Sequence, residues 1–310
     1  MRLRVIHETV YQYTPAVQNA QHMAHLRPRT GLVQRVLTHT LHVEPAPTQC
    51  QTAQDVFGNT RAFFNLPFTH ERLHVRAESL LETTPPPPAP PGEPWEAVRE
   101  RLAYRRGMPF HPAAEFGFAS PYIPRHTDFV AYARESFAPG RPLMAVASHL
   151  MSRIHADFAY TAHATDAGTP ALESLRLRRG VCQDFAHVMI GCLRSMGLAA
   201  RYVSGYLLTE PPPGQPRLVG ADASHAWVSV WSPAATEGDD RPEGEEWFDL
   251  DPTNDRAAGE DYVTLAIGRD YSDVSPLRGV IHGGDHHVLQ VAVTVEPIGV
   301  RPPTAPENPG

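Results

Sequence analysis

The chain has 310 residues and a net charge of −7, so it has room for two modest domains and is not expected to bind nucleic acid or an anionic membrane. Its apolar fraction of 42% is ordinary for a globular protein, and no apolar run approaches the roughly 18 residues of a membrane span. The three cysteines are scattered without a C-x-x-C pair, and the N-terminus lacks the apolar core of a signal peptide, so we expect a reduced, cytoplasmic protein.

Residues 1–83 are predicted to form a β-sandwich-like domain. Near the N-terminus the residues alternate as in a strand, and residues 36–43 and 73–81 have strand composition. Residues 57–60 (FGNT) are typical of a turn between strands. Nothing in this region indicates chemistry, so its role stays open between a scaffold and a surface that presents substrate.

A proline-rich stretch over residues 84–94 follows this domain. Prolines cannot donate hydrogen bonds and favour the polyproline II conformation, so the stretch is predicted to be an extended, semi-rigid connector. It marks the predicted boundary to a second domain over residues 95–297. A proline-rich tail over residues 298–310 is predicted to be disordered.

The second domain is predicted to begin with helices and to end with strands. The predicted helices cover residues 95–104, 128–137, 143–154 and 182–196. After Gly197 the apolar period changes to two, as in strands. The predicted strands cover residues 200–208, 225–231 and 247–251. This order indicates an α+β fold with an antiparallel sheet behind a helix. Residues 267–284 are predicted to be irregular, and a last strand over residues 288–295 could close either sheet.

The segment from Gly180 to Gly197 (GVCQDFAHVMIGCLRSMG) places Cys182 where a helix begins. Free N–H groups at a helix N-terminus stabilise a thiolate, the form in which a cysteine acts as a nucleophile. A small buried cysteine is the more ordinary interpretation when nothing else accompanies it. The residues downstream decide between these two interpretations.

A histidine and two aspartates lie on the strands that follow. His225 begins one predicted strand, and Asp249 and Asp251 share a face of the next. A thiol at a helix start, an imidazole at a strand start and a carboxylate on the neighbouring strand can meet at one edge of the sheet. There the imidazole takes the thiol proton, the carboxylate orients the imidazole and the thiolate attacks a carbonyl. Each residue alone has an ordinary structural explanation, but together they predict a Cys–His–Asp site.

Three blocks of sequence carry a family resemblance: RRGVCQDFAHVMIGCLRSMGLAARYVSGYL, DASHAWVSVW and WFDLDPTND. They resemble the core of the bacterial transglutaminase-like proteins, a branch of the papain-like cysteine enzyme superfamily. The N-terminal HETVYQY, HLRPR and FGN motifs are similar to the β-rich region that precedes this core in the family. The resemblance implies a β-sandwich-like domain followed by a papain/transglutaminase-like core, in which a helix bearing the cysteine packs on an antiparallel sheet.

The resemblance also implies a role for each residue of the predicted site. Cys182 matches the nucleophile and His225 the base. Asp251 matches the orienting carboxylate, because the family's aspartate directly precedes the proline of the D-P-T-N block. The strand pattern alone leaves Asp249 open as an alternative acid.

Further positions are candidates for the oxyanion site or the cleft. The backbone N–H of Cys182 is one candidate oxyanion donor because it opens a helix. Tyr160, Gln183 and Trp227 are the other candidates for an oxyanion donor or a cleft wall. The sequence does not decide among them.

We predict no metal and no cofactor. His282, Asp285, His286 and His287 follow one another closely, but adjacent histidines in a glycine-rich loop rarely present a closed set of ligands. No calcium loop of the D-x-D-x-D-G type is present, so no calcium dependence is expected.

The predicted function is cysteine-dependent acyl transfer at an amide carbonyl through a thioester. Hydrolysis of the amidase or peptidase kind is favoured, because it only needs water to reach the thioester. The alternatives are transglutaminase-type transfer to an amine and a non-catalytic module that binds peptides. The predicted partner is a peptide or amide substrate, without nucleic acid or membrane, and the oligomeric state stays open.

Overall fold

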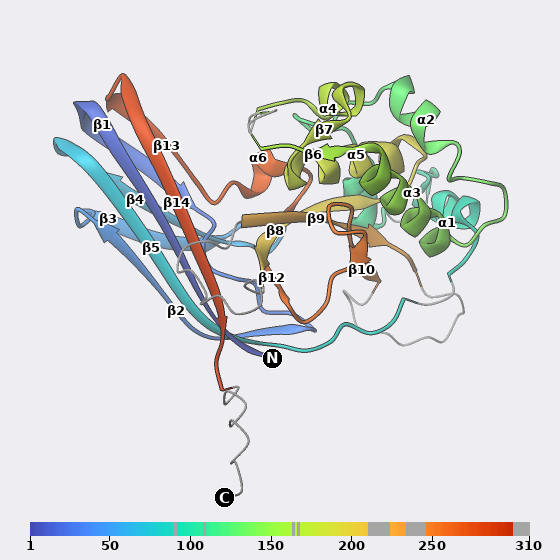
Figure 1. The fold of residues 1–310 in the computed structure, drawn as a ribbon, viewed down its shortest axis with the longest axis horizontal. Coiled ribbons are helices and arrows are strands. Elements are labelled where there is room, and N and C mark those ends of the chain that lie inside the picture. Colours follow the sequence, from blue (N-terminus) through green and yellow to red (C-terminus); the bar gives the residue numbers. More distant parts are fainter. Residues whose placement is uncertain are drawn as a thin grey trace, which may run out of the picture.

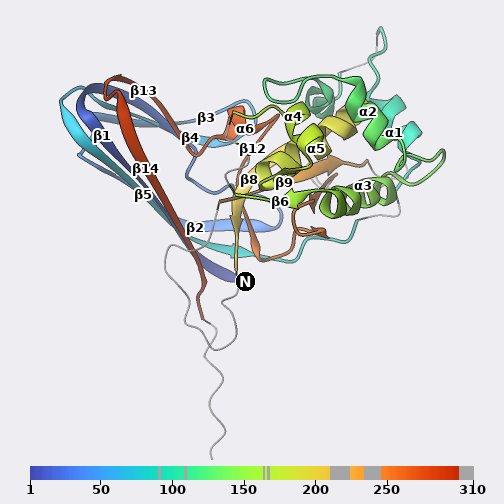
Figure 2. The same cartoon turned by 45° about the horizontal axis from the view of Figure 1, so that its top comes forward.

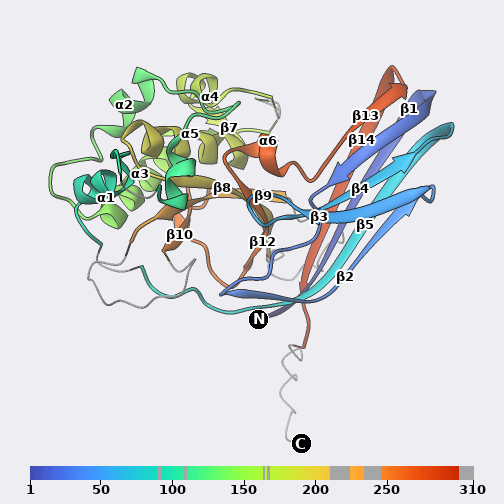
Figure 3. The ribbon, with the colours of Figure 1, turned by 180° about the vertical axis from the view of Figure 1, so that it is seen from behind.

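The computed structural model describes residues 1–89, 92–107, 110–162, 165, 168–209, 224–233 and 246–299. The described residues form two lobes that lie side by side, a curled antiparallel sheet and a second sheet covered by helices (Figures 1 and 2). Seen from behind, the connector leaves the first lobe and runs along the second toward its helices (Figure 3). The tail predicted to be disordered lies outside the described residues from residue 300 onward.

One long bent strand, β1, organises the first lobe. Its first half pairs with β5 and β14, and its second half pairs with β4 and β13. In the described chain the strands of this sheet are β1 (Arg2–Ala24), β2 (Gln34–Glu44), β3 (Gln49–Gln54), β4 (Thr60–Leu66), β5 (His70–Thr83), β13 (Leu277–Gly283) and β14 (His286–Pro297). Side chains from both halves share one core, in which Leu73 and Val75 of β5 join Phe64 and Leu66 of β4. The sheet therefore folds over itself about β1, as the predicted sandwich-like domain requires.

The last strand joins the first sheet, a choice that the sequence left open. β14 pairs with β1 from Leu3, opposite Pro297, to Thr14, opposite His286, and β13 continues the same edge. The predicted second domain over residues 95–297 therefore ends in two strands that belong to the sheet of the first domain. A pairing between the two ends of a chain has no local signal in the sequence, because each strand is recognised only from its own residues.

The prediction that residues 267–284 are irregular is wrong. This stretch holds a short helix, α6 (Tyr271–Val274), and the strand β13. The side chains of β13 are mostly exposed, so the alternation of apolar and polar residues that marks a half-buried strand is missing. Hydrogen bonds to β1 define this strand instead.

The second lobe confirms the predicted α+β arrangement. Its helices within the described residues are α1 (Trp95–Leu102), the 3₁₀ helix η1 (Pro112–Gly117), α2 (Thr127–Ala133), α3 (Leu143–Asp157), α4 (Ala171–Leu177), α5 (Cys182–Ser195) and α6. Its antiparallel sheet has the order β11 (Arg256–Ala257), β10 (Trp247–Asp251), β9 (Ser224–Trp231), β8 (Ala200–Leu207), β12 (Tyr262–Gly268). A small parallel pair, β6 (Ala159–Tyr160) and β7 (Arg179–Gly180), lies beside α5.

Helix α5 occupies the centre of the second lobe and packs on β8 and β9. The predicted apolar positions Phe185, Val188 and Leu193 are buried in its core. At Gly191 an added Cβ would lie 2.8 Å from the ring of Phe129, so α2 packs against α5 only because this residue has no side chain. None of the helices in the described chain is both long and apolar enough to span a bilayer.

Candidate active site

The turn before α5 is held by one buried carboxylate. Asp184, in the first turn of the helix, accepts the N–H of Val181 at 2.8 Å and the hydroxyl of Ser174 at 2.6 Å. Gly180 makes room for this arrangement, because a Cβ at that position would overlap the Asp184 carboxylate. Cys182 then follows as the first residue of α5, where the sequence predicts it.

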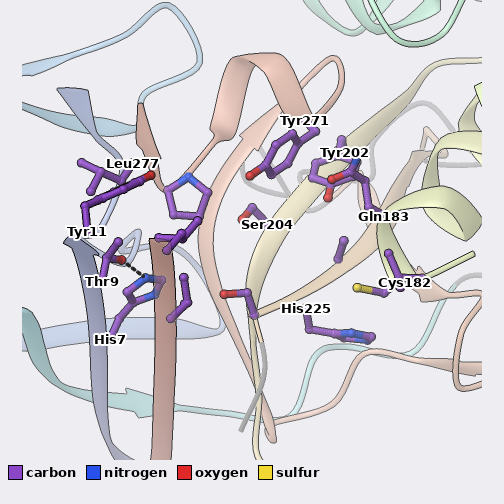
Figure 4. Close-up of a pocket in the computed structure, with 16 residues that line it drawn as sticks. His7, Thr9, Tyr11, Cys182, Gln183, Tyr202, Ser204, His225, Tyr271 and Leu277 are labelled. Carbon is purple, nitrogen blue, oxygen red and sulfur yellow. Dashed lines mark hydrogen bonds between the residues drawn. The ribbon is translucent and has the colours of Figure 1, made fainter. Parts of the chain in front are cut away.

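The imidazole of His225 links the thiol to a second buried carboxylate. Its Nε2 lies 2.6 Å from Asp251 Oδ2 and 3.4 Å from Asn254 Nδ2, and Cys182 is a further hydrogen-bond partner of the imidazole. Figure 4 shows the sulfur of Cys182 beside the His225 ring. Burial lowers the pKa of His225, but the hydrogen bonds to Asp251 and Cys182 outweigh burial and raise that pKa to about 10. The site therefore favours an imidazolium at neutral pH, which stabilises a thiolate next to it.

Asp251 has no exposed surface, and donors satisfy both of its carboxylate oxygens. Oδ2 accepts from Asn254 Nδ2 and from the Tyr262 hydroxyl, each at 2.7 Å, besides His225. Oδ1 accepts from the backbone N–H of Thr253 at 2.8 Å. Burial by itself raises the pKa of Asp251, but the hydrogen bonds from His225, Asn254 and Tyr262 hold it below its usual value. The carboxylate is therefore ionised and held in one orientation behind the imidazole.

Asn254 and Tyr262 are site residues that the sequence analysis missed. Asn254 lies in the D-P-T-N block only three residues after Asp251, and a turn there brings the two side chains together. The D-P-T-N residues could have predicted this turn. Tyr262 lies on β12, which is separated from Asp251's strand by two others, so only the packing behind the sheet brings its hydroxyl to the carboxylate.

The alternative acid, Asp249, accepts a hydrogen bond from a different residue. Its Oδ2 accepts the indole N–H of Trp227 at 2.9 Å, whereas His225 bonds to Asp251. Trp227 is fully buried and packs edge-on against Tyr262, with ring centroids 5.2 Å apart. It does not line the cleft above the thiol, so the expectation that it forms a cleft wall is wrong. Burial of the large ring in the core, with its N–H satisfied by Asp249, accounts for this position.

A cleft of about 240 Å³ lies over Cys182 and His225, between the two lobes (Figure 4). Gln183 lines it beside the thiol, together with Tyr202 of β8. Strands β1 and β14 of the first lobe supply the opposite wall. The cleft is therefore complete only when both lobes are present.

Tyr160 lies near the thiol but outside this cleft. Its side chain is 59% exposed, and its ring packs on Phe185, with centroids 6.3 Å apart. Burial first, and the charge of Cys182 second, raise the pKa of Tyr160, so the phenol lies within electrostatic reach of the thiol. Its contribution to an oxyanion site stays a prediction.

The histidines near the C-terminus are spread over two strands. His282 lies on β13, and His286 and His287 lie on β14. Throughout the described ranges, no three His, Cys, Asp or Glu side chains gather in a way that could hold a metal ion.

Comparison with known proteins places these features in a family. The family model for the bacterial transglutaminase-like N-terminal region matches residues 3–82, and the model for the transglutaminase-like superfamily matches residues 130–252. Uncharacterized proteins of Mycobacterium bovis and Mycobacterium tuberculosis are 43% identical over 304 residues, which cover 96% of this chain and 93% of each relative.

Two further comparisons concern a relative that matches part of the chain and a solved structure. A protein-glutamine gamma-glutamyltransferase of Pseudomonas aeruginosa is 33% identical over 119 residues, which are 37% of this chain and 16% of that protein. The crystal structure of a proposed cysteine protease from Cytophaga hutchinsonii has the same fold, with a TM-score of 0.72 at 17% identity over 97% of this chain and 92% of that one.

Proposed function

Because this chain belongs to the transglutaminase-like superfamily, and because a thiol, an imidazole and a carboxylate meet at its cleft, we propose that it is a cysteine-dependent acyl-transfer enzyme. Its substrate is a peptide or another amide, and its intermediate is a thioester on Cys182. The observation that carries the proposal is the hydrogen-bonded chain from Cys182 through His225 to the buried Asp251. Family membership alone would not suffice, because one fold can host unrelated functions.

The proposed reaction has two halves. The Cys182 thiolate attacks the amide carbonyl, and the tetrahedral oxyanion is met by the Cys182 backbone N–H at the start of α5. The carbon–nitrogen bond then breaks, and the amine leaves with the proton of the His225 imidazolium. In the second half His225 takes a proton from water, the hydroxide attacks the thioester, and the sulfur departs as thiolate. Asp251 keeps its charge throughout and holds the imidazole in position.

We propose water as the acyl acceptor, because hydrolysis requires no second binding site. Transfer to an amine is the second candidate, supported by the 33% identity to the Pseudomonas aeruginosa gamma-glutamyltransferase over 119 residues. The two reactions share the first half and differ only in what attacks the thioester. Analysis of the reaction products distinguishes the two reactions, whereas the geometry of the triad is the same for both.

The proposal is tested by incubating the protein with a library of peptides and isopeptides, with and without an added primary amine. Mass spectrometry reads the products, and the Cys182→Ala variant serves as the control. We expect hydrolysed products that disappear with Cys182→Ala. Amine adducts in place of hydrolysis would favour the transferase, and no product from any amide would contradict the enzyme proposal.

Alkylation by iodoacetamide tests the activated thiol without a substrate. Cys50 is exposed on β3 and serves as an internal reference, whereas Cys182 is only partly exposed. Accessibility alone would make Cys50 react faster. We expect Cys182 to react at least ten-fold faster at neutral pH, because thiolate rather than thiol is the nucleophile. A rate for Cys182 at or below that of Cys50 would favour the non-catalytic binding module.

A further inference from the structure

The wall of the cleft that faces the thiol comes from the first lobe. On β1, Thr9 and Tyr11 point toward the cleft, and on β14 the residues directly opposite them in the register are Val291 and Leu289. Figure 4 shows Thr9 and Tyr11 on one side of the cleft and Cys182 on the other. A substrate side chain that extends from the thiol across the cleft would meet side chains of the N-terminal sheet.

The described residues that line this cleft carry no formal charge apart from the catalytic pair. Among its described lining residues there is no Asp, Glu, Lys or Arg. The one further imidazole, His7, is buried, and burial lowers its pKa to about 4, so it is neutral at physiological pH. Its Nδ1 forms a hydrogen bond with the Tyr206 hydroxyl at 3.0 Å, and its Nε2 forms one with the Thr9 hydroxyl at 3.1 Å. No free cation or anion of the described wall can pair with a charged substrate group.

The remaining wall is largely apolar and aromatic. Leu277, Leu289 and Val291 contribute aliphatic surface, and Tyr11 and Tyr202 contribute rings. Burial raises the pKa of both tyrosines, so they stay uncharged. A volume of about 240 Å³ is below the range of pockets for drug-sized ligands, and it suits a single side chain.

We propose that the cleft selects an uncharged, mainly apolar residue next to the reacting amide, and that the N-terminal sheet is the wall that makes this selection. The proposal rests on the acyl-transfer function given above. A charged side chain entering this cleft would lose part of its hydration without gaining an ion pair from the described wall, whereas an apolar one gains from leaving water. The first domain thus acts as a specificity-determining surface rather than only as a scaffold.

The test compares peptides that share one reacting amide and differ only in the residue beside it, with Leu, Phe, Gln, Glu or Lys at that position. We expect kcat/KM to be at least ten-fold higher for the uncharged members than for Glu or Lys. The Leu289→Glu variant places a carboxylate in the wall and should raise the ratio of the Lys peptide to the Leu peptide about ten-fold, equivalent to about 1.4 kcal/mol.

Val288→Glu is the matched control. Val288 neighbours Leu289 on the same strand and is similarly exposed, 60% against 48%, but its side chain points to the opposite face of the sheet. We expect Val288→Glu to leave the preference of the enzyme unchanged. Equal rates for charged and uncharged peptides, or the same shift in both variants, would overturn the specificity proposal while leaving the enzyme proposal intact. Absence of amide turnover altogether would instead refute the acyl-transfer function itself.

Discussion

Replacing Asp251 with asparagine removes the negative charge behind His225 while keeping the size of the side chain. The pKa of His225 is raised from 6.5 to about 10, which corresponds to about 5 kcal/mol in favour of the imidazolium at about 1.4 kcal/mol per pH unit. Asp251 and Cys182 together cause this rise, and the hydrogen bond to Asp251 is the larger of the two hydrogen-bond contributions. A hydrogen bond to a charged group contributes about 2–3 kcal/mol, so loss of the Asp251 charge behind the imidazolium should cost on the order of a hundred-fold in rate.

The assay is kcat/KM measured against pH for the native enzyme, Asp251→Asn and Asp249→Asn, on a peptide identified in the library experiment. We expect Asp251→Asn to lower kcat/KM about a hundred-fold. The alkaline limb of the pH profile should also move to lower pH, because an imidazolium without the carboxylate gives up its proton more readily. Asp249→Asn should change little, since an asparagine oxygen can still accept the Trp227 N–H.

Two outcomes would refute this reasoning. One is a greater loss of activity with Asp249→Asn than with Asp251→Asn, which would reassign the carboxylate. The other is an alkaline limb that stays in place when the Asp251 charge is removed, which would show that this charge does not control the proton on His225. Thermal unfolding of each variant is the accompanying control, because Asp251 is fully buried and a loss of fold would imitate a loss of catalysis.

Three other variants test the surroundings of the site. Tyr262→Phe removes a hydroxyl that donates to Asp251 at 2.7 Å. We expect kcat/KM to fall about five-fold, equivalent to about 1 kcal/mol, and the alkaline limb of the pH profile to move to lower pH. An unchanged pH profile would mean that the hydroxyl has a merely structural role. Gly180→Ala introduces a Cβ 2.6 Å from the Asp184 Cγ. We expect the free energy of unfolding, measured in urea, to fall by about 1–3 kcal/mol. An unchanged free energy of unfolding would mean that the turn can shift freely. Cys182→Ala should abolish turnover and leave the urea midpoint near that of the native protein, and residual activity would place the nucleophile elsewhere.

Sequence reasoning located the main elements of the second lobe because each has a local signal. Helix α5 has an apolar period of 3.6 and ends before Gly197, which takes the left-handed conformation with φ of 86°. Strands β8 and β9 have strand-type composition and are buried along most of their length, and β10 alternates apolar and polar residues. Strand β13 has neither signal, because most of its side chains are exposed and its backbone pairs with β1, 250 or more residues away in sequence.

The same difference separates the parts of the site. The order of thiol, imidazole and carboxylate along the chain is given directly by the sequence, and the position of Cys182 at a helix start follows from the residues beside it. The strand pattern placed Asp249 and Asp251 on one face and could not choose between them. The structure distinguishes their partners, because Trp227 occupies one carboxylate and His225 the other.

By itself, the amino-acid sequence determined the helix that carries the thiol, the strands that carry its partners and the acyl-transfer chemistry these residue types permit. The family resemblance named Asp251 as the carboxylate, whereas the tertiary structure alone decided that Tyr262 supports it and that β1 and β14 close the cleft. The physical reason is the distance along the chain over which each interaction acts. Periodicity and capping act over a few neighbouring residues, whereas sheet pairing and burial join segments that no local pattern connects.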